Sequence, residues 1–236
     1  MDKYLSLIIP AYNEEKRLAA SLRKAMEYLE KKEYSSEIVV VDDGSRDRTS
    51  EVAHSCSDSI VVLTQPRNMG KGAAVRRGML ESCGRFRVFT DADFSTPIKE
   101  LEKVLPLLED GADVCIGSRA MDPSMIKEHQ PFYREFMGKT FNKFVSTLFF
   151  KGIKDTQCGF KGFSASAAEK VFSISRIDGF SFDVEAIYLA KKLGLRVDQV
   201  PVEWYNDERS TVNPITDSIR MFLELLKIRK LHKSIY

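Results

Sequence analysis

Two aspartates one residue apart, Asp91 and Asp93, are the side chains of this sequence best suited to chemistry. They follow the apolar run 86–90, which is typical of a buried strand. Two carboxylates at this spacing can approach one hard cation, and Mg²⁺ or Mn²⁺ usually keeps substrate diphosphate oxygens in its shell. The alternative is a pair of solvated turn aspartates. The position directly after a strand favours the metal site.

A second acidic pair, Asp42 and Asp43, ends another apolar run, 38–41. A carboxylate at a strand end can accept a hydrogen bond from a base N–H or a ribose hydroxyl, as in dinucleotide-binding folds. The alternative is a helix cap, which Ser45 or Asp47 could supply alone. Two adjacent aspartates are more than a cap requires.

A third strand-like run ends at Pro10 and is followed by Tyr12 and Glu14. The Tyr12 ring could stack on a base, and the Glu14 carboxylate could bind a sugar diol. The alternative is a polar turn that leads into a helix with an acidic first turn.

Lys71 lies in the glycine-containing segment 67–72, which does not match a P-loop because Gln65 and Gly72 occupy the places of the required Gly and Ser or Thr. No G-x-G-x-x-G follows the first strand, which argues against a nicotinamide or flavin enzyme. Helix N-terminal amides together with Lys71 could still attract a diphosphate.

The elements that must position these residues alternate between strand and helix. Apolar runs at 4–10, 38–41, 59–63, 86–90 and 113–116 predict strands, and 14–32, 45–54, 70–80 and 97–108 predict helices. This alternation predicts an α/β fold with a parallel sheet and right-handed crossovers. Ligands of such sheets bind beyond the carboxyl ends of the strands.

The rhythm changes after Arg119. We expect a loop at 121–130, a Phe-rich helix at 132–150, strands at 157–163 and 197–204, a helix at 181–193, a polar loop at 206–214, and an amphipathic helix at 215–231.

Bulk composition excludes several classes of protein. The 236 residues, 43% apolar and 30% charged, suit one globular domain, and the net charge of +2 gives no reason to expect nucleic-acid binding. The four cysteines are scattered without a C-x-x-C pair, which indicates reduced thiols in a cytoplasmic protein. We expect no signal peptide and no transmembrane segment, because no apolar run approaches the ~20 residues that a span needs.

Taken together, P-A-Y-N-E at 10–14, V-V-V-D-D-G-S-R-D-R-T at 39–49, R-N-M-G-K-G-A-A-V-R-R-G at 67–78 and D-A-D at 91–93 resemble the GT-A family 2 glycosyltransferases. D-T-Q-C-G-F-K at 155–161 and F-D-V-E at 182–185 look most like the dolichyl-phosphate β-glucosyltransferase branch. V-P-V-E-W and D-S-I-R-M near the end extend the resemblance over nearly the whole chain.

The resemblance implies a three-layer α/β/α sandwich with a mostly parallel sheet, in a single domain 1–236. Residues 1–118 would bind the nucleotide sugar, and 119–236 would bind the acceptor with amphipathic helices. The implied reaction is an inverting transfer of glucose from UDP-glucose to dolichyl or polyprenyl phosphate. The alternatives are a GDP-mannose donor, another family 2 transferase with a non-lipid acceptor, nucleotidyl transfer, and a binding module without catalysis.

The resemblance also assigns residues to roles. Asp93 and Asp91 would hold Mg²⁺ or Mn²⁺, and Asp93, Arg119 and Arg134 would be catalytic. Near the C-terminus the sequence reads Arg209-Ser210-Thr211 where the family tends toward G-[ST]-K, so the expected lysine is absent and Arg209 would substitute for it. Ser95 stands where the mannose synthase branch has Gln. The nucleotide sugar would contact Pro10, Tyr12, Glu14, Asp42, Asp43, Lys71, Asp91, Ala92 and Asp93, and the acceptor phosphate would contact Arg119, Arg134 and Arg209.

No strong general base is required, because a phosphate monoester has a second pKa near ~6 and is a dianion at neutral pH. Asp183 and Glu185 are therefore open to a base role or to orienting Arg or Lys side chains.

We expect the chain to act peripherally at the cytoplasmic face of a membrane, where a membrane-protein partner could also hold it. Two amphipathic segments could provide the contact. The alternatives are that both pack on the core, or that the second makes an oligomer contact. The first is marked by Phe136, Phe141, Phe144, Leu148 and Phe149 with Lys139, Lys143 and Lys151, and the second, 219–231, by Arg220, Lys227, Arg229 and Lys230 with Lys233 nearby.

Overall fold

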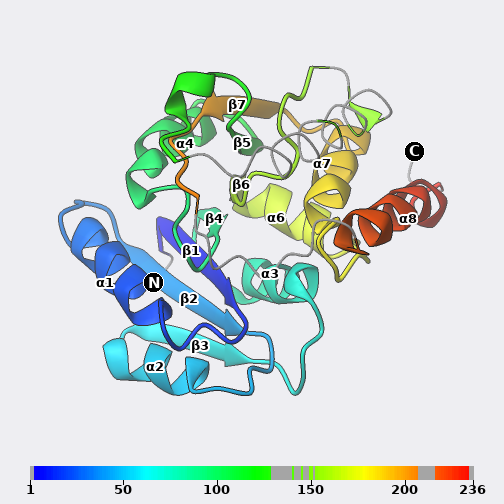
Figure 1. Cartoon of the computed structure of the whole chain (residues 1–236). Coiled ribbons are helices and arrows are strands. Elements are labelled where there is room, and N and C mark those ends of the chain that lie inside the picture. Colours follow the sequence, from blue (N-terminus) through cyan, green and yellow to red (C-terminus); the bar gives the residue numbers. More distant parts are fainter. Residues whose placement is uncertain are drawn as a thin grey trace.

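The computed structural model of the chain describes residues 3–128, 140, 145, 149, 150, 152–206 and 216–233, without the side chains of 216–222. Strands and helices alternate through its first half, as predicted (Figure 1). The elements are β1 (Leu5–Ala11), α1 (Leu18–Leu29), β2 (Ser36–Asp42), α2 (Thr49–Cys56), β3 (Ile60–Thr64), α3 (Lys71–Glu81), β4 (Phe86–Thr90), a 3-10 turn η1 (Ile98–Glu100), α4 (Leu101–Glu109) and β5 (Val114–Ser118).

The second half adds two more strands to the same sheet. Its elements are a 3-10 turn η2 (Pro123–Met125), β6 (Phe160–Ser164), α6 (Ala165–Phe172), α7 (Phe182–Lys192), β7 (Val197–Pro201) and α8 (Thr216–Leu231). Within the described residues, every helix is too short or too polar to cross a bilayer.

The sheet has the order β3-β2-β1-β4-β6-β5-β7 and is mostly parallel. β6 is the exception, since it runs antiparallel to both β4 and β5. Asp155, just before β6, contacts Arg119, just after β5. The chain therefore re-enters the sheet from the rim where β5 ended and has to run in the opposite direction. The five strands of the predicted β-α alternation share one direction, and with the antiparallel β6 the whole sheet is mostly parallel, as the family resemblance implied.

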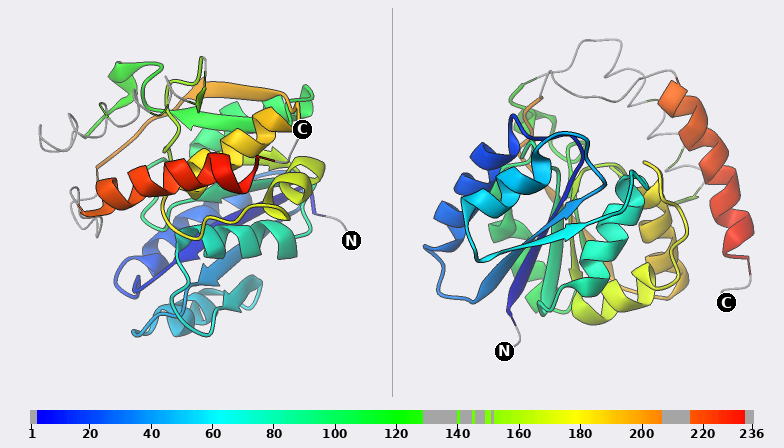
Figure 2. Two further views of the ribbon diagram at one scale, coloured as in Figure 1. Left: turned by 90° about the vertical axis from the view of Figure 1, so that its right-hand side faces the viewer. Right: turned by 90° about the horizontal axis from the view of Figure 1, so that it is seen from below.

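Helices cover both faces of the sheet, which gives the predicted three layers (Figures 1 and 2). Apolar side chains of α1, α2 and α4 form one core with one face of the sheet, and those of α3, α6, α7 and α8 form the other. All seven residues of β1 are buried because both of its faces are covered.

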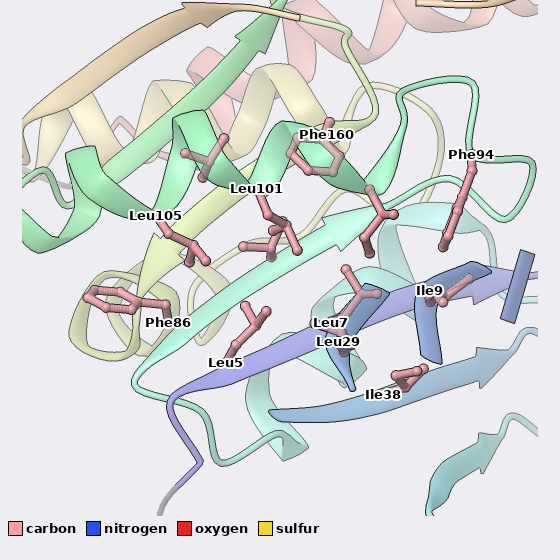
Figure 3. Close-up of a cluster of buried hydrophobic side chains, with 14 of the residues drawn as sticks. Leu5, Leu7, Ile9, Leu29, Ile38, Phe86, Phe94, Leu101, Leu105 and Phe160 are labelled. Atoms are coloured by element: carbon pink, nitrogen blue, oxygen red, sulfur yellow. The ribbon is translucent and has the colours of Figure 1, made fainter. Parts of the chain in front are cut away.

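The first core shows how the strand period places side chains. Leu5, Leu7 and Ile9 alternate along β1 and point to the same layer. They meet Leu101 and Leu105 of α4, together with residues from α1 and the neighbouring strands (Figure 3).

Several local structures differ from the expectation. α1 begins at Leu18, not at residue 14, because the chain first forms a turn in which the Leu18 N–H donates to the Glu14 carbonyl. β7 ends at Pro201, and Trp204 instead pairs with Ile126, inside the segment that was predicted to be a loop. The sequence analysis missed α6, although Ser164 caps it as an ordinary N-cap serine would.

The described part of the chain leaves several expectations untested. The Phe-rich segment 132–150 is described only at residues 140, 145, 149 and 150, and 207–215 are not described. The four cysteines are free thiols, of which Cys115 and Cys158 are buried.

Gly78 sets the distance between α3 and the sheet. A Cβ on Gly78 would lie 2.5 Å from Ile8 Cγ2 and 2.9 Å from Val41 Cγ2. We expect Gly78→Ala to lower the free energy of unfolding by ~1–3 kcal/mol in urea denaturation, although Ala is the better helix former by ~1 kcal/mol. The double variant with Ile8→Ala should be less destabilised than the two single changes predict together. A stabilised Gly78→Ala protein would contradict this packing.

Candidate active site

The carboxyl ends of three neighbouring parallel strands form the rim that carries the predicted site. β1, β2 and β4 lie side by side in the sheet, so Pro10, Asp42 and Asp91 come to the same edge (Figure 1). The backbone N–H of Asp43 donates to the carbonyl of Ala11 at 2.8 Å and joins the first two strand ends. The expected gathering of these segments at one rim is therefore present.

The loops that follow β1 and β2 are bonded to each other. The backbone N–H of Asn13 donates to Ser45 Oγ at 2.9 Å, and that of Glu14 donates to Thr49 Oγ1 at 2.7 Å. Asn13 has a φ of 56°, a left-handed conformation that Asn tolerates better than most residues. These bonds fix the loop that presents Tyr12.

Tyr12 and Glu14, which were predicted to hold the nucleoside, differ in their surroundings. The Tyr12 side chain is 38% exposed and accessible to a base. Glu14 forms a bidentate ion pair with Arg17, whose Nη1 also lies 3.8 Å from Asp93 Oδ2. Arg17 thus connects the nucleoside loop to the D-x-D segment. The sequence analysis missed it, because a lone Arg at a helix start is indistinguishable from a surface charge.

Asp42 and Asp43 are each 3% exposed, and their carboxylates have different partners. Asp42 accepts one hydrogen bond, at 3.0 Å, from a backbone N–H three residues further along. Asp43 accepts three, from Gln65 Nε2 at 2.7 Å and from the N–H groups of Met69 and Gly70 at 2.8 Å each. Asp43 therefore holds the loop that leads into α3, and a contact to the nucleotide remains a prediction.

The D-x-D carboxylates lie at the start of the loop after β4. Asp91 Oδ1 is 2.5 Å from Lys71 Nζ, and Asp93 Oδ1 accepts the Ser95 N–H at 2.9 Å. Burial and then the charge of Asp91 raise the pKa of Asp93 above its ordinary value. A Cβ at Gly159 would overlap the Asp91 carboxylate, so only glycine allows this approach.

Lys71 begins α3 and lies among carboxylates. Burial alone would lower the pKa of its ammonium group, but Asp91, Asp183 and Asp93 together raise it. Lys71 is therefore protonated at neutral pH. It lies beside the D-x-D pair, where a diphosphate would need positive charge.

A buried ion pair lies behind Lys71, and the sequence analysis did not predict it. Lys161 in β6 is fully buried, and its Nζ donates to Asp183 Oδ1 at 2.6 Å and to the carbonyl of Cys158. Asp183 lies in the first turn of α7, where a helix N-terminus favours a carboxylate. Of the two open roles for Asp183, the geometry shows the orienting one.

Glu185 lies two residues after Asp183 in α7 and has a separate set of partners. Its carboxylate accepts the backbone N–H groups of Arg176 and Ile177 at 2.9–3.0 Å and contacts His232 Nε2 at 2.6 Å. Glu185 is fully buried. It therefore supports the loop before α7 and the end of α8.

Arg119 lies at the end of β5 and is held by Asp155. Arg119 Nε and Nη2 bond the two oxygens of Asp155 at 2.7 and 3.0 Å, and its guanidinium lies 5.6 Å from the centre of the Trp204 ring. Burial alone would raise the pKa of Asp155, but Arg119 lowers it to about 2. The two other predicted acceptor residues, Arg134 and Arg209, lie outside the described residues.

The D-x-D pair fits a divalent cation only if substrate completes its shell. Among the described residues, no group of three or more His, Cys, Asp and Glu side chains could hold a metal. The two carboxylates, of which the half-buried Asp93 has a raised pKa, nevertheless form a centre of negative charge that a cation would stabilise. Ala92, between them, is 5% exposed and has no side-chain atom that could bind a metal.

A cavity of about 740 Å³ adjoins Asp93. It lies next to the D-x-D segment, and both acidic and basic side chains line it. Its lining includes Lys24, Phe94, Ser95, Lys99, Glu203 and Tyr205. A sugar-sized ligand held at Asp93 would have room on this side.

Comparison with known proteins decides the family. A family model described as glycosyl transferase family 2 matches residues 6–172. The chain belongs to glycosyl transferase family 2. It is 37% identical over 242 residues to a dolichyl-phosphate beta-glucosyltransferase of Dictyostelium discoideum, covering 96% of this chain and 74% of the relative. The human protein of that name is 37% identical over 243 residues, covering 96% and 75%.

Solved structures of other proteins superpose on this glycosyltransferase over nearly its whole length. Mannosyl-3-phosphoglycerate synthase from Rubrobacter xylanophilus superposes with a TM-score of 0.73 at 22% identity, covering 98% of this chain and 75% of that one. Glucosyl-3-phosphoglycerate synthase from Mycobacterium tuberculosis, in complex with Mn²⁺, UDP-glucose and phosphoglyceric acid, gives 0.67 at 18% identity, covering 96% and 79%. These similarities establish the GT-A fold.

The Arg119–Asp155 pair gives a pH dependence of stability. The pKa of Asp155 is about 2 in the folded chain against an ordinary 3.8, so its contribution is present above pH ~4 and is lost as pH falls towards 2. We expect this loss to be on the order of 2 kcal/mol in urea unfolding of the wild type. Asp155→Asn should remove it and flatten the curve, whereas Asp58→Asn, at an exposed position, should not. Equal curves for all three proteins would contradict the pairing.

Proposed function

We propose that this glycosyltransferase moves glucose from UDP-glucose to dolichyl or polyprenyl phosphate, with inversion at the sugar. The named activity of the curated relatives, at 37% identity over 96% of the chain, supports the acceptor and the sugar. The observation in the structure that carries the proposal is the arrangement of charges at the rim. Lys71 and the D-x-D carboxylates lie at the end of β4, and Arg119, fixed by Asp155, lies at the end of β5 on the same rim.

On the donor side, Tyr12 would stack on the base, and Asp42 would accept from the ribose or base. Asp93 and Asp91 would hold Mg²⁺ or Mn²⁺, which, when bound, supplies Lewis-acid stabilisation of the diphosphate. Lys71, protonated and 2.5 Å from Asp91, is placed to neutralise charge that develops on the leaving UDP.

On the acceptor side, Arg119 would bind the phosphate. Its fixed guanidinium suits a phosphate oxygen pair. In the displacement, a phosphate oxygen forms the new bond to the anomeric carbon while the bond from that carbon to the UDP oxygen breaks. The acceptor is already a dianion at neutral pH, since its second pKa is near ~6, so no side chain needs to take a proton. Asp183 is paired with Lys161 and is not needed as a general base.

We place this reaction at the cytoplasmic face of a membrane, because the proposed acceptor is a lipid. The curated relatives are named for a dolichyl phosphate substrate.

A donor panel tests the proposed reaction. The wild type is mixed with polyprenyl phosphate, Mg²⁺ or Mn²⁺, and UDP-glucose, GDP-mannose or UDP-N-acetylglucosamine, and released nucleoside diphosphate is measured. We expect release with UDP-glucose and a β-linked product. Preference for GDP-mannose would assign the mannosyl reaction instead, and pyrophosphate release would indicate nucleotidyl transfer. No release with any donor would refute the proposal.

Asp93→Asn tests the metal site. Because the amide carries no charge, we expect the variant to bind Mn²⁺ in the presence of UDP-glucose at least tenfold more weakly by calorimetry. Turnover should fall about 100-fold or more. Asp58→Asn, at an exposed position, is the matched control and should behave as the wild type. An Asp93→Asn protein with unchanged Mn²⁺ affinity would remove Asp93 from the site.

A further inference from the structure

Helix α8 is attached to the body of the protein by one face. Leu225, Ile228 and His232 on this face are 0–2% exposed, and the two apolar side chains pack in the core shared with α3, α6 and α7. His232 Nε2 contacts Glu185 Oε1 at 2.6 Å, which fixes the end of the helix to α7. Figure 2 shows α8 lying along the outside of α7, at the edge of the molecule.

Two more contacts fix α8 against rotation. The Ser181 N–H, just before α7, donates to a Glu224 carboxylate oxygen at 3.4 Å. The guanidinium of Arg229 lies 4.5 Å from the centre of the Phe149 ring. Phe149 is half-buried and packs against the core beside α8, and a lipid contact by the Phe-rich segment stays a prediction. The opposite face of α8 is held in a defined orientation.

That opposite face is apolar and basic. Leu223, Leu226 and Leu231 are 55%, 60% and 46% exposed, which is unusual for three leucines of one helix. Their spacing places them on one side of the helix with Lys227, Lys230 and Lys233, all exposed. None of these lysines has an ion-pair partner within the described residues.

We propose that the outer face of α8, formed by these three leucines and three lysines, docks on a bilayer that contains anionic lipid. Leucine side chains would enter the boundary between head groups and acyl chains, and the lysines would extend their stems along it and place their ammonium groups at lipid phosphates. Basic side chains near an anionic leaflet each contribute to such binding.

The distribution of charge favours a bilayer over a second copy of the chain. In a two-fold symmetric dimer through this face, Lys227, Lys230 and Lys233 would meet the same lysines of the other copy. Like charges brought together at an interface are unfavourable. Glu224, the acidic side chain at the border of this face, accepts the Ser181 N–H, whereas an anionic membrane supplies charge complementary to the lysines.

The docking face is also connected to the candidate active site. Glu224 of α8 contacts the loop before α7, and in that loop the Asp178 carbonyl accepts the N–H of Gly72 at 2.7 Å, next to Lys71. A bilayer held by α8 would therefore lie close to the chain segments that form the site. The docking proposal rests on α8 alone, and the proposed function only adds a lipid acceptor within reach.

Vesicle binding without any donor or acceptor tests the proposal. The full chain is cosedimented with vesicles of phosphatidylcholine alone or with 30% phosphatidylserine, at low and high salt. We expect the wild type to partition to the anionic vesicles about tenfold or more better, and added salt to weaken this binding. Equal partitioning to the two vesicle types would overturn the proposal.

Two surface variants locate the contact. Leu223→Gln with Leu226→Gln should lower partitioning about tenfold or more, and Lys227→Gln with Lys230→Gln and Lys233→Gln about tenfold to a hundredfold. Glutamine is a good helix former, so α8 should persist, which circular dichroism checks. The matched controls are Val61→Thr, at a 42% exposed position in β3, and Lys31→Gln with Lys170→Gln and Lys191→Gln, at exposed positions elsewhere. Equal losses in the controls would overturn the assignment to α8.

Two further measurements separate this proposal from its rivals. A wild-type dimer in sedimentation that the leucine variant converts to monomer would show that a second copy covers the face, and would overturn the docking. Turnover with detergent-dispersed polyprenyl phosphate should be equal in the wild type and both α8 variants. Absence of turnover in the wild type there would refute the proposed function and leave vesicle binding as the independent result.

Discussion

The placement of charged groups at the carboxyl edge of a sheet covered on both faces is the constraint on which this site depends. Each such group must be paired, because an isolated charge loses far more hydration than it can recover. Lys71 lies beside Asp91, Lys161 bonds Asp183, and Arg119 bonds Asp155. These pairs fix where positive charge is available, and they join strands and helices from both halves of the sequence.

The same pairs explain why the second half of the chain belongs to the site. β6 runs back through the sheet between β4 and β5, and brings Lys161 behind the D-x-D segment. Gly159, just before it, leaves room for the Asp91 carboxylate. The donor residues of the first half are therefore positioned in part by β6, a strand from the second half of the chain. Because the chain belongs to glycosyl transferase family 2, we interpret this arrangement as a site for glycosyl transfer.

Part of the site could be predicted from the sequence, because its residues belong to short contiguous motifs. An apolar strand that ends in carboxylates predicts its own position at the rim, so Asp42, Asp91 and Asp93 could be grouped before any contact was known. Arg17 and Lys161 could not. Arg17 looks like any exposed arginine, and a lysine in a strand gives no sign that it is fully buried. Each contacts a site carboxylate more than twenty positions away, Arg17 at Asp93 and Lys161 at Asp183.

The sequence by itself determined the alternation of strands and helices, the rim, and the family, because these follow from short-range periodicity and contiguous motifs. Only the tertiary structure decided that β6 runs antiparallel, that Asp43 holds the loop before α3, and that Glu185 joins α7 to His232. It also decided which face of α8 is left uncovered. The physical reason is that burial and charge pairing are set by residues distant in the chain, and no local pattern records them.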